Sequence, residues 1–387
     1  MTRTLKTILT CAAVLVYALG ALTSWSKPLP NADPAFVVAA VPPPADADRP
    51  VFESTFITPE EEGAIVHAPS ICRTSTGDLF AAWYGGTREG AADVCIYFAK
   101  RSPGADAPWQ ELRAIVSRDT ARRELGRYVR KVGNAIVFAD DADRMWLAYV
   151  SIAVGGWAGS SLNVKVSEDL GATWSQSERL TLSPLFNISE LVKCKPAPLA
   201  RGGFAVPIYH ENLGLFPEML WLNRSENGAI RAVKTRICGG RSFIQPSIVP
   251  LDGAGAKAFL RRTSQTSAVG FTETNDGGLS WSTPRYLDLP NPNAAVDGLL
   301  LSGGRILLAF NDDAHARENL TLALSNDGGR AWTRAAVIED ELGAGHYPYM
   351  IRGADGLIHL VYTWHRRRIR HVTFNEAWLL ERMEETR

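Results

Sequence analysis

Residues 85–93, which read GGTREGAAD, combine glycines with side chains that can bind anions and transfer protons. Glycines allow a loop to approach a ligand closely, so we expect a functional loop here. Within it, Glu89 is the preferred proton donor, Asp93 is the second choice, and Arg88 could contact a negatively charged substrate. A charged hairpin turn with no chemical role is the alternative interpretation.

Arginines at three positions could hold the anionic part of such a substrate. A guanidinium group binds a carboxylate through two parallel hydrogen bonds, which an ammonium group cannot do. Arg261 and Arg262 are adjacent in a strand-like run, so their side chains point to opposite faces and only one can serve a shared site. Spacing favours Arg261 for that role, and Arg262 should face solvent or a neighbouring ion-pair partner. Arg317, in the polar stretch at residues 311–319, is the third candidate.

Two further segments place ionisable side chains on apolar strands. Tyr209, His210 and Glu211 end the run that begins at Phe204, and alternation along a strand puts Tyr209 and Glu211 on the same face. Glu211 could therefore act as a base, or form a structural ion pair at the rim. Tyr347 precedes a proline, a position that suits a core aromatic as well as a reacting hydroxyl.

The elements that position these residues are predicted to be strands. From residue 51 onward, about fifteen short apolar runs are separated by Gly, Asp and Asn turns, and helical periodicity is nearly absent. This pattern predicts an all-β domain.

One turn recurs along the domain with the pattern Ser/Thr-x-Asp-x-Gly-x-x-Trp. Full copies occupy residues 167–174, 274–281 and 325–332, and degenerate copies occupy 102–109 and 224–228. In each turn the Asp should accept backbone N–H groups, the Gly should take a positive φ, and the Trp should pack between sheets. A unit of about 50–60 residues with four strands is a propeller blade, so about 320 residues predict six blades, or seven shorter ones. A strand near residues 51–56 should close the ring against the last blade.

The N-terminal part of the chain differs from the rest. In residues 1–26, Arg3 and Lys6 precede a long apolar run, which predicts a signal peptide or a membrane anchor. Either would place the remaining chain outside the cytoplasm, as a periplasmic or secreted protein. Residues 27–50 are rich in proline and predict a stiff linker, followed by the propeller over residues 51–387.

Composition excludes several classes of protein. The chain has 41 basic and 41 acidic residues, so its net charge gives no basic surface for nucleic acid. Histidines and cysteines lack zinc-ligand spacing, and the repeated turns lack a calcium-binding loop, so we expect no metal or other cofactor. Cys72, Cys95, Cys194 and Cys238 lie in apolar runs, which favours buried free thiols over two disulfides.

The repeated turns resemble the Asp-boxes, or BNR repeats, of the sialidase (neuraminidase) superfamily, over about residues 51–375. The likeness is greatest to its bacterial sialidase-like branch. The resemblance implies a six-bladed propeller in which residues on inner strands form the site, while the boxes lie on the outer rim. It also implies three arginines for the substrate carboxylate, a tyrosine nucleophile with a glutamate beside it, and an aspartate acid/base.

Several positions match this pattern, and two depart from it. The resemblance assigns the nucleophile to Tyr347 and two of the arginines to Arg317 and Arg261. His67 stands in place of the first arginine, in His-Ala-Pro, and Gln245 stands in place of the glutamate. The acid/base would come from the loop at residues 85–93, through Glu89 or Asp93.

The resulting hypothesis is an exo-glycosidase that hydrolyses the glycoside of an acidic, sialic-acid-like sugar. One alternative is a polysaccharide lyase on a uronate-containing glycan, with His67 and Tyr347 as base and acid. The other is a non-catalytic glycan-binding propeller. In each case the expected partner is a glycan, and contact with a membrane is expected only through the N-terminal segment.

Overall fold

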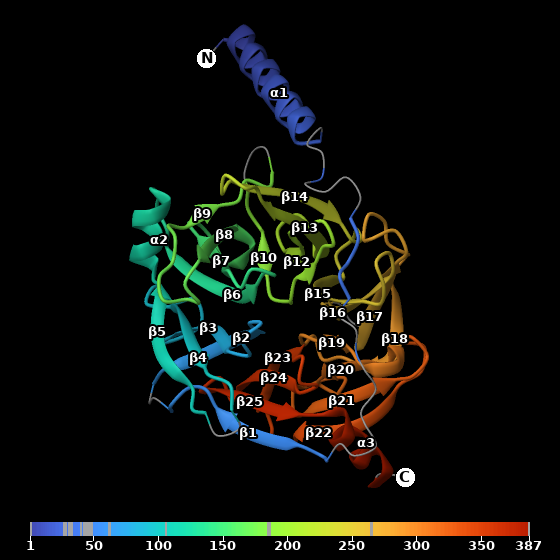
Figure 1. The fold of residues 1–387 in the computed structure, drawn as a ribbon. Helices are drawn as coiled ribbons and strands as arrows, with labels where there is room; N and C mark the ends of the chain where they lie inside the picture. The colour runs from blue at the N-terminus through green and yellow to red at the C-terminus, as the bar shows by residue number, and fades with distance from the viewer. Residues whose placement is uncertain are drawn as a thin grey trace.

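Six antiparallel sheets are arranged around a central axis as the blades of a β-propeller (Figure 1). The structure is a computed structural model that describes residues 2–25, 29, 34–38, 41, 49–60, 63–104, 107–183, 187–263 and 266–385. The prediction of an all-β, six-bladed propeller is therefore confirmed.

Each blade runs outward from its innermost strand. Blades 1 and 2 consist of β2 (Ile65–Arg73), β3 (Leu79–Gly86), β4 (Cys95–Arg101) and β5 (Gln110–Val116), then β6 (Lys131–Ala139), β7 (Met145–Ile152), β8 (Ser160–Ser167) and β9 (Glu178–Arg179). Blade 3 has an interrupted inner strand, formed by β10 (Leu191–Val192) and β11 (Ala197–Pro198), followed by β12 (Phe204–His210), β13 (Phe216–Arg224) and β14 (Ile230–Arg236).

The remaining blades follow the same order. Blade 4 contains β15 (Phe243–Pro250), β16 (Ala256–Arg262), β17 (Ala268–Thr274) and β18 (Arg285–Pro290), and blade 5 contains β19 (Asp297–Leu300), β20 (Ile306–Phe310), β21 (Leu320–Ser325) and β22 (Thr333–Glu339). Blade 6 contains β23 (Gly345–Arg352), β24 (Ile358–Trp364), β25 (Arg368–Phe374) and, outermost, β1 (Phe52–Phe56).

The burial of the strands follows from this stacking. All eight residues of β7 and of β8 are buried, because sheets cover both faces of these strands. The outermost strand β5 is largely exposed. β1 pairs with β25, from Phe52 opposite Phe374 to Phe56 opposite Arg370, so the two ends of the propeller share one blade. The predicted ring closure is confirmed.

The three full copies of the repeated turn close in the same way. Asp276, for example, accepts hydrogen bonds from the Ser280 backbone N–H (2.9 Å) and the Thr274 hydroxyl (2.7 Å). Trp174 and Trp332 each place their ring edge-to-face against a phenylalanine of the preceding blade, at 5.6 Å between centroids. These turns join the third and fourth strands of a blade, and their tryptophans hold neighbouring blades together.

Helices are few among the described residues. They are α1 (Arg3–Trp25), α2 (Arg118–Leu125), α3 (Glu376–Glu385) and the short 3₁₀ turns η1 (Trp157–Gly159) and η2 (Ser302–Gly304). α1 lies outside the propeller (Figure 1) and is long and apolar enough to cross a membrane. A signal sequence near the N-terminus has the same properties, so α1 is compatible with either role.

Residues 34–38 of the proline-rich segment, here called the strap, lie against the propeller. Phe36 is only 3% exposed and packs among core residues of blades 3 and 4. Its backbone N–H donates to the Gly253 carbonyl (2.9 Å), and the Val37 N–H donates to the Pro198 carbonyl (2.8 Å). Part of the segment predicted as a linker is thus packed as a structural element.

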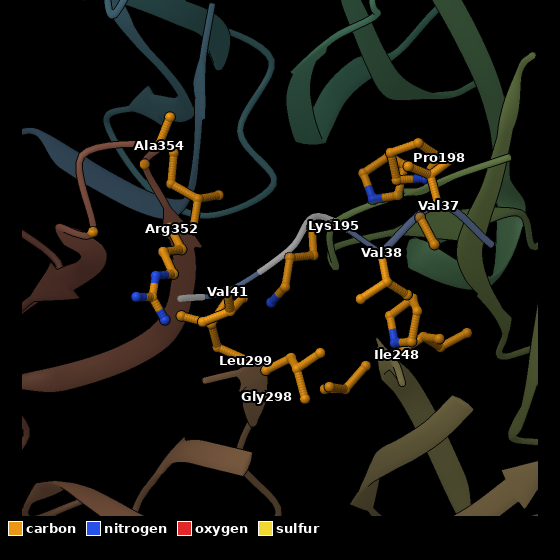
Figure 2. A pocket seen from close by; sticks show the side chains of 18 residues that line it. Val37, Val38, Val41, Lys195, Pro198, Ile248, Gly298, Leu299, Arg352 and Ala354 are labelled. Carbon is orange, nitrogen blue, oxygen red and sulfur yellow. The ribbon is translucent and has the colours of Figure 1, made fainter. Parts of the chain in front are cut away.

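The strap crosses the end of the propeller at which the inner strands finish. A cavity of 530 Å³ lies there, lined by Val37, Val38 and Val41 together with Ile248 of β15 and Arg352 of β23 (Figure 2). We call this end the rear. The opposite end, where β2, β6, β15 and β23 begin, is the front.

The five cysteines are free thiols in the structure. Cys72 and Cys194 are buried, and Cys95 and Cys238 are half-buried. This agrees with the expectation of packed thiols rather than disulfides.

Candidate active site

Four inner strands each contain one non-glycine residue with a left-handed backbone near the front end. These residues are Ala68 (φ 51°), Asn134 (φ 32°), Gln245 (φ 51°) and Tyr347 (φ 55°). Each lies at a β-bulge, where the pairing register shifts. A bulge re-aims side chains, and such backbone strain is concentrated at functional sites.

Tyr347 contacts the arginine and the glutamine that the sequence placed beside it. The Arg261 Nη1 donates to the Tyr347 hydroxyl (3.2 Å) and to the Gln245 Oε1 (3.1 Å). Burial opposes ionisation of the tyrosine, but the positive charges of Arg261 and Arg317 and the hydrogen bonds outweigh it, so the pKa of Tyr347 lies below its ordinary value. Tyr347 is thus more easily ionised than an ordinary tyrosine.

Asn293 holds both arginines. Its Oδ1 accepts from the Arg261 Nε (2.8 Å), and its carbonyl accepts from the Arg317 Nη2 (2.6 Å). The Arg317 Cζ lies 5.9 Å from the centroid of the Tyr347 ring. Asn293 lies in the loop between β18 and β19 and has a positive φ of 56°. The sequence analysis missed this residue, although it stands in an Asn-Pro-Asn turn signal at residues 291–293.

A second tyrosine closes the floor of the cluster. The Tyr209 hydroxyl accepts hydrogen bonds from the Asn134 Nδ2 (3.0 Å) and the Gln245 Nε2 (3.1 Å). Burial raises the pKa of Tyr209, and the charge of nearby Glu211 adds to this effect. Tyr209 is therefore a neutral group that fixes the orientation of the two amide side chains.

His67 lies against Tyr347, and burial keeps its imidazole uncharged. Its ring packs edge-to-face on Tyr347, with 4.7 Å between centroids, and its Nδ1 lies 3.1 Å from the Thr363 hydroxyl. Burial lowers the pKa of His67 well below its usual value, and Arg366 and other positive groups lower it further. The position at which the sequence resemblance would place a first arginine therefore holds a neutral imidazole.

The loop at residues 85–93 places its three charged side chains differently. The Glu89 carboxylate pairs with Arg366 (3.1 Å), which lies in the turn between β24 and β25. Asp93 is exposed and accepts from the Thr87 backbone N–H (2.9 Å), which lowers its pKa. This bond assigns Asp93 to closing its own loop rather than to the cluster around Tyr347. Arg88 is exposed, with no ion pair among the described residues.

Glu211 is the second carboxyl group beside the cluster. Its backbone N–H donates to the Ser189 hydroxyl (2.6 Å). Burial raises the pKa of Glu211, and the charge of Arg261 opposes that rise. A carboxyl group whose pKa is raised in this way can hold a proton for transfer.

The neighbouring arginine, Arg262, points away from the site. Its guanidinium lies over the Tyr286 ring, 4.4 Å from the centroid, and donates to the Thr266 carbonyl. The two guanidinium groups therefore diverge as expected, but the expectation that Arg262 faces solvent or an ion-pair partner is wrong, because Arg262 is buried against an aromatic ring.

Seven of the residues selected from the sequence lie in or beside one front-end cluster: His67, Glu89, Glu211, Gln245, Arg261, Arg317 and Tyr347. Arg261 and Arg317, which have neutral hydrogen-bond partners, surround a tyrosine whose pKa is lowered, and the carboxyl groups of Glu89 and Glu211 interact with neighbouring arginines. This arrangement can hold an anionic ligand and transfer a proton. Among the described residues, no group of three His, Cys, Asp or Glu side chains could hold a metal ion.

Comparisons with known proteins agree on a family for this chain. A family model described as a BNR repeat-like domain matches residues 77–360. A protein of unknown function from Dyadobacter fermentans has a TM-score of 0.65 at 13% identity, over 84% of this chain and 98% of its own. No match was found among curated proteins.

Two solved sialidase-type structures are also similar. An intramolecular trans-sialidase from Ruminococcus gnavus, in complex with oseltamivir carboxylate, has a TM-score of 0.65 at 14% identity and covers 81% of this chain and 95% of its own. The Trypanosoma rangeli sialidase has a TM-score of 0.65 at 12% identity, covering 87% of this chain and 61% of its own. At these identities the likeness establishes the fold.

Proposed function

Because the chain belongs to the sialidase-like BNR repeat family, we propose that it is an extracytoplasmic enzyme that cleaves the glycoside of an acidic sugar. Residues 1–26 would serve as its signal peptide or anchor, and the propeller would carry the site. The observation that carries the proposal is the placement of Arg261 and Arg317 around the hydroxyl and ring of Tyr347.

The two arginines supply the binding site for a carboxylate. Their hydrogen-bond partners are the neutral groups of Asn293, Gln245 and Tyr347, so neither has a protein carboxylate of its own among the described residues. A half-buried guanidinium with only neutral partners gains most from an anionic ligand. The sugar carboxylate would therefore lie between the arginines, with the anomeric carbon next to Tyr347.

In the hydrolytic reaction, Tyr347 attacks the anomeric carbon as a phenolate. The bond from that carbon to the leaving oxygen breaks as the bond to the Tyr347 oxygen forms, and a carboxyl group gives the leaving oxygen a proton. Water then releases the sugar and returns the proton to that carboxylate. Glu211 is the favoured donor because of its raised pKa, and Glu89 is the alternative.

Gln245 favours a second candidate reaction. In place of a glutamate it puts an amide beside Tyr347, which cannot accept the phenol proton. In a uronate lyase, the Tyr347 phenolate would remove the proton next to the carboxylate, and the arginines would neutralise the charge that develops. Breaking the glycosidic bond on the adjacent carbon then leaves an unsaturated sugar, and the proton passes to the leaving oxygen.

One assay separates the two reactions. The protein from residue 29 onward is incubated with sialosides and with uronate polysaccharides, and released reducing sugar and unsaturated product are measured separately. Tyr347→Phe should abolish either activity while ligand affinity stays within a few-fold, because the ring is kept and only the hydroxyl is lost. Glu211→Gln and Glu89→Gln identify the proton donor as the variant with the larger loss.

A glycan-binding protein gives a different result in the same assay. It would bind an acidic glycan with neither product formed, and Tyr347→Phe would have no turnover to remove. Wild-type rates in Tyr347→Phe on an identified substrate would refute both catalytic assignments of this residue.

A further inference from the structure

Lys131 lies at the front end of blade 2, close to the cluster described above. It is the first residue of β6, three positions before Asn134, whose amide contacts Tyr209. The strands β6 and β2 are neighbours around the axis (Figure 1). A side chain on Gly90 would place its Cβ 2.7 Å from the Lys131 Nζ, so the loop that carries Glu89 packs closely on the ammonium group.

Trp157 holds Lys131 in position. The Lys131 Nζ lies 4.9 Å from the centroid of the indole, which is a favourable cation–π distance. The indole in turn packs on the backbone of Gly133, where an added Cβ would lie 2.5 Å from the ring. Trp157 is half-buried, so part of its ring remains accessible.

A row of aromatic side chains connects Trp157 with the reacting tyrosine. The Trp157 ring lies 6.1 Å from Tyr84, Tyr84 lies 5.7 Å from His67, and His67 lies 4.7 Å from Tyr347, each between centroids. Rings at these distances touch. Tyr84 and His67 are buried, so this row connects Lys131 and Trp157 to the Tyr347 cluster through packed rings of blade 1.

Lys131 has no ion-pair partner among the described residues, unlike other half-buried lysines of the chain. Lys195 pairs with Asp297, and Lys234 pairs with Glu190 and Glu218. Burial lowers the pKa of Lys131, and the charge of Arg130 lowers it further, while Glu89, whose carboxylate is already paired with Arg366, opposes this shift. Arg88 and Arg130, both exposed, add positive charge on the same side. A partly desolvated ammonium in a positive environment is unfavourable unless an anion completes it.

We infer that Lys131 and Trp157 form a second subsite that binds a second anionic sugar of the same glycan, through its carboxylate or sulfate group and its ring. Trp157 offers an apolar surface for the ring, and Lys131 offers a positive charge for the anionic group. This inference rests on the proposed function, because it places the second sugar next to the one that Arg261 and Arg317 hold. The preferred substrate would then carry acidic groups on two adjacent sugars.

The test compares ligands that carry one or two anionic sugars. The probes are sialyllactose and a methyl uronoside as monoacids, and disialic acid, a uronic-acid dimer and its sulfated counterpart as diacids, with affinities measured by calorimetry. The variants are Lys131→Met, which keeps the apolar stem, Trp157→Leu, Arg317→Lys and the control Lys257→Met. Lys257 pairs with Glu273 at the rear of blade 4. Melting curves establish that each variant is folded.

Lys131→Met should weaken binding of a diacid about ten- to a hundred-fold, the scale of a charge-assisted hydrogen bond, and should change monoacid binding less than two-fold. Trp157→Leu should also weaken binding of the diacid, and Lys257→Met should leave its affinity unchanged. The diacid whose affinity falls most in Lys131→Met shows whether the second anionic group is a carboxylate or a sulfate.

The second subsite would be refuted if Lys131→Met left diacid binding unchanged while Arg317→Lys weakened every acidic ligand, and the proposed function would stand. Loss with Lys131→Met but not with Arg317→Lys would instead refute the proposed carboxylate site and the adjacency argued from it. If Trp157→Leu does not fold, the result with Lys131→Met alone decides.

Discussion

The hydroxyl of Tyr347 lies 3.2 Å from the Nη1 of Arg261. This contact joins the last inner strand of the ring to the second strand of blade 4. Under the proposed function it would couple substrate binding to the ionisation of Tyr347. The same guanidinium would turn toward the carboxylate of a bound sugar. Anion binding should then reduce the positive field on the phenol and raise the pKa of Tyr347.

The ionisation of Tyr347 can be followed by ultraviolet difference spectroscopy. Its pKa is lowered, whereas burial raises the pKa values of Tyr84, Tyr209 and Tyr349. Among these four, Tyr347 should ionise first, and its step should be lost in Tyr347→Phe. Because the folded pKa lies below the unfolded value of about 10, this group adds stability as pH rises toward that value, and the gain is lost as pH falls through the folded pKa. A titration identical in Tyr347→Phe would contradict this assignment.

Arg261 and Arg262 provide a matched pair of variants. Lysine keeps the charge but not the planar two-point donor, so Arg261→Lys should weaken binding of an acidic sugar about ten- to a hundred-fold. Arg262→Lys should leave affinity within two-fold, because that guanidinium lies on Tyr286 and not in the cluster. Equal losses in the two variants, measured by calorimetry, would place the carboxylate elsewhere.

The repeated turns should contribute to stability and not to turnover. Asp276→Ala removes the acceptor for the Ser280 N–H and the Thr274 hydroxyl. The turn is exposed, so water can replace part of these bonds, and we expect a loss of about 1 kcal/mol in the free energy of unfolding. Activity per folded molecule should be unchanged. An Asp276→Ala protein with its full melting temperature but no turnover would show that this turn is functional.

The fold was predictable because its signals are local. The turn at residues 274–281 contains its own hydrogen-bond acceptor, its glycines and its tryptophan, so the pattern can be read without knowing what lies nearby. Ring closure by residues 51–56 was predictable because a propeller must pair its ends to remove exposed strand edges.

The site was predictable where a residue stands on an inner strand, as Tyr347 and Gln245 do. The contribution of Arg366 was not, because a turn between β24 and β25 brings it next to Glu89 from the other end of the sequence. Asn293 and Lys131 were missed for the same reason, since each acts through contacts with residues distant in the chain. One sequence signal for the bulges was not used. Three of the four bulged inner-strand residues precede a proline, namely Ala68, Gln245 and Tyr347.

The free energy of unfolding should already decrease as the pH falls from 7 to 5, a window above the pH range in which most carboxylates titrate. Burial lowers the pKa values of His210, His346 and His359 to about 4, and those of His67 and His371 well below the usual value. Between pH 7 and 5 these five histidines bind more protons in the unfolded chain than in the folded protein. They outnumber the buried carboxyl groups with the opposite effect, such as Glu190, whose pKa is raised to about 7, so the free energy of unfolding decreases as pH falls. Each histidine contributes a slope of up to about 1.4 kcal/mol per pH unit.

Urea unfolding at a series of pH values measures this slope. His346→Gln should reduce it, because one of these histidines no longer titrates. A stability that stays constant from pH 7 to 5, or a slope unchanged in His346→Gln, would contradict the assignment of these neutral imidazoles.

The strap should stabilise the propeller. The proline-rich composition of residues 27–50 predicted only a linker and did not indicate this role. Phe36 fills a socket between blades 3 and 4, and the carbonyl of Pro34 lies so close to Gly277 that an added Cβ there would approach it to 2.1 Å. Removing a buried phenylalanine ring costs about 3 kcal/mol or more, so Phe36→Ala should lower the melting temperature clearly. Val37→Ala is the control, because Val37 is 46% exposed. A protein that starts at residue 49 lacks the strap and should show the full decrease in melting temperature, whereas one that starts at residue 29 should show none. If the two fragments melt at the same temperature, the strap is only a covering of the rear cavity and contributes no stability.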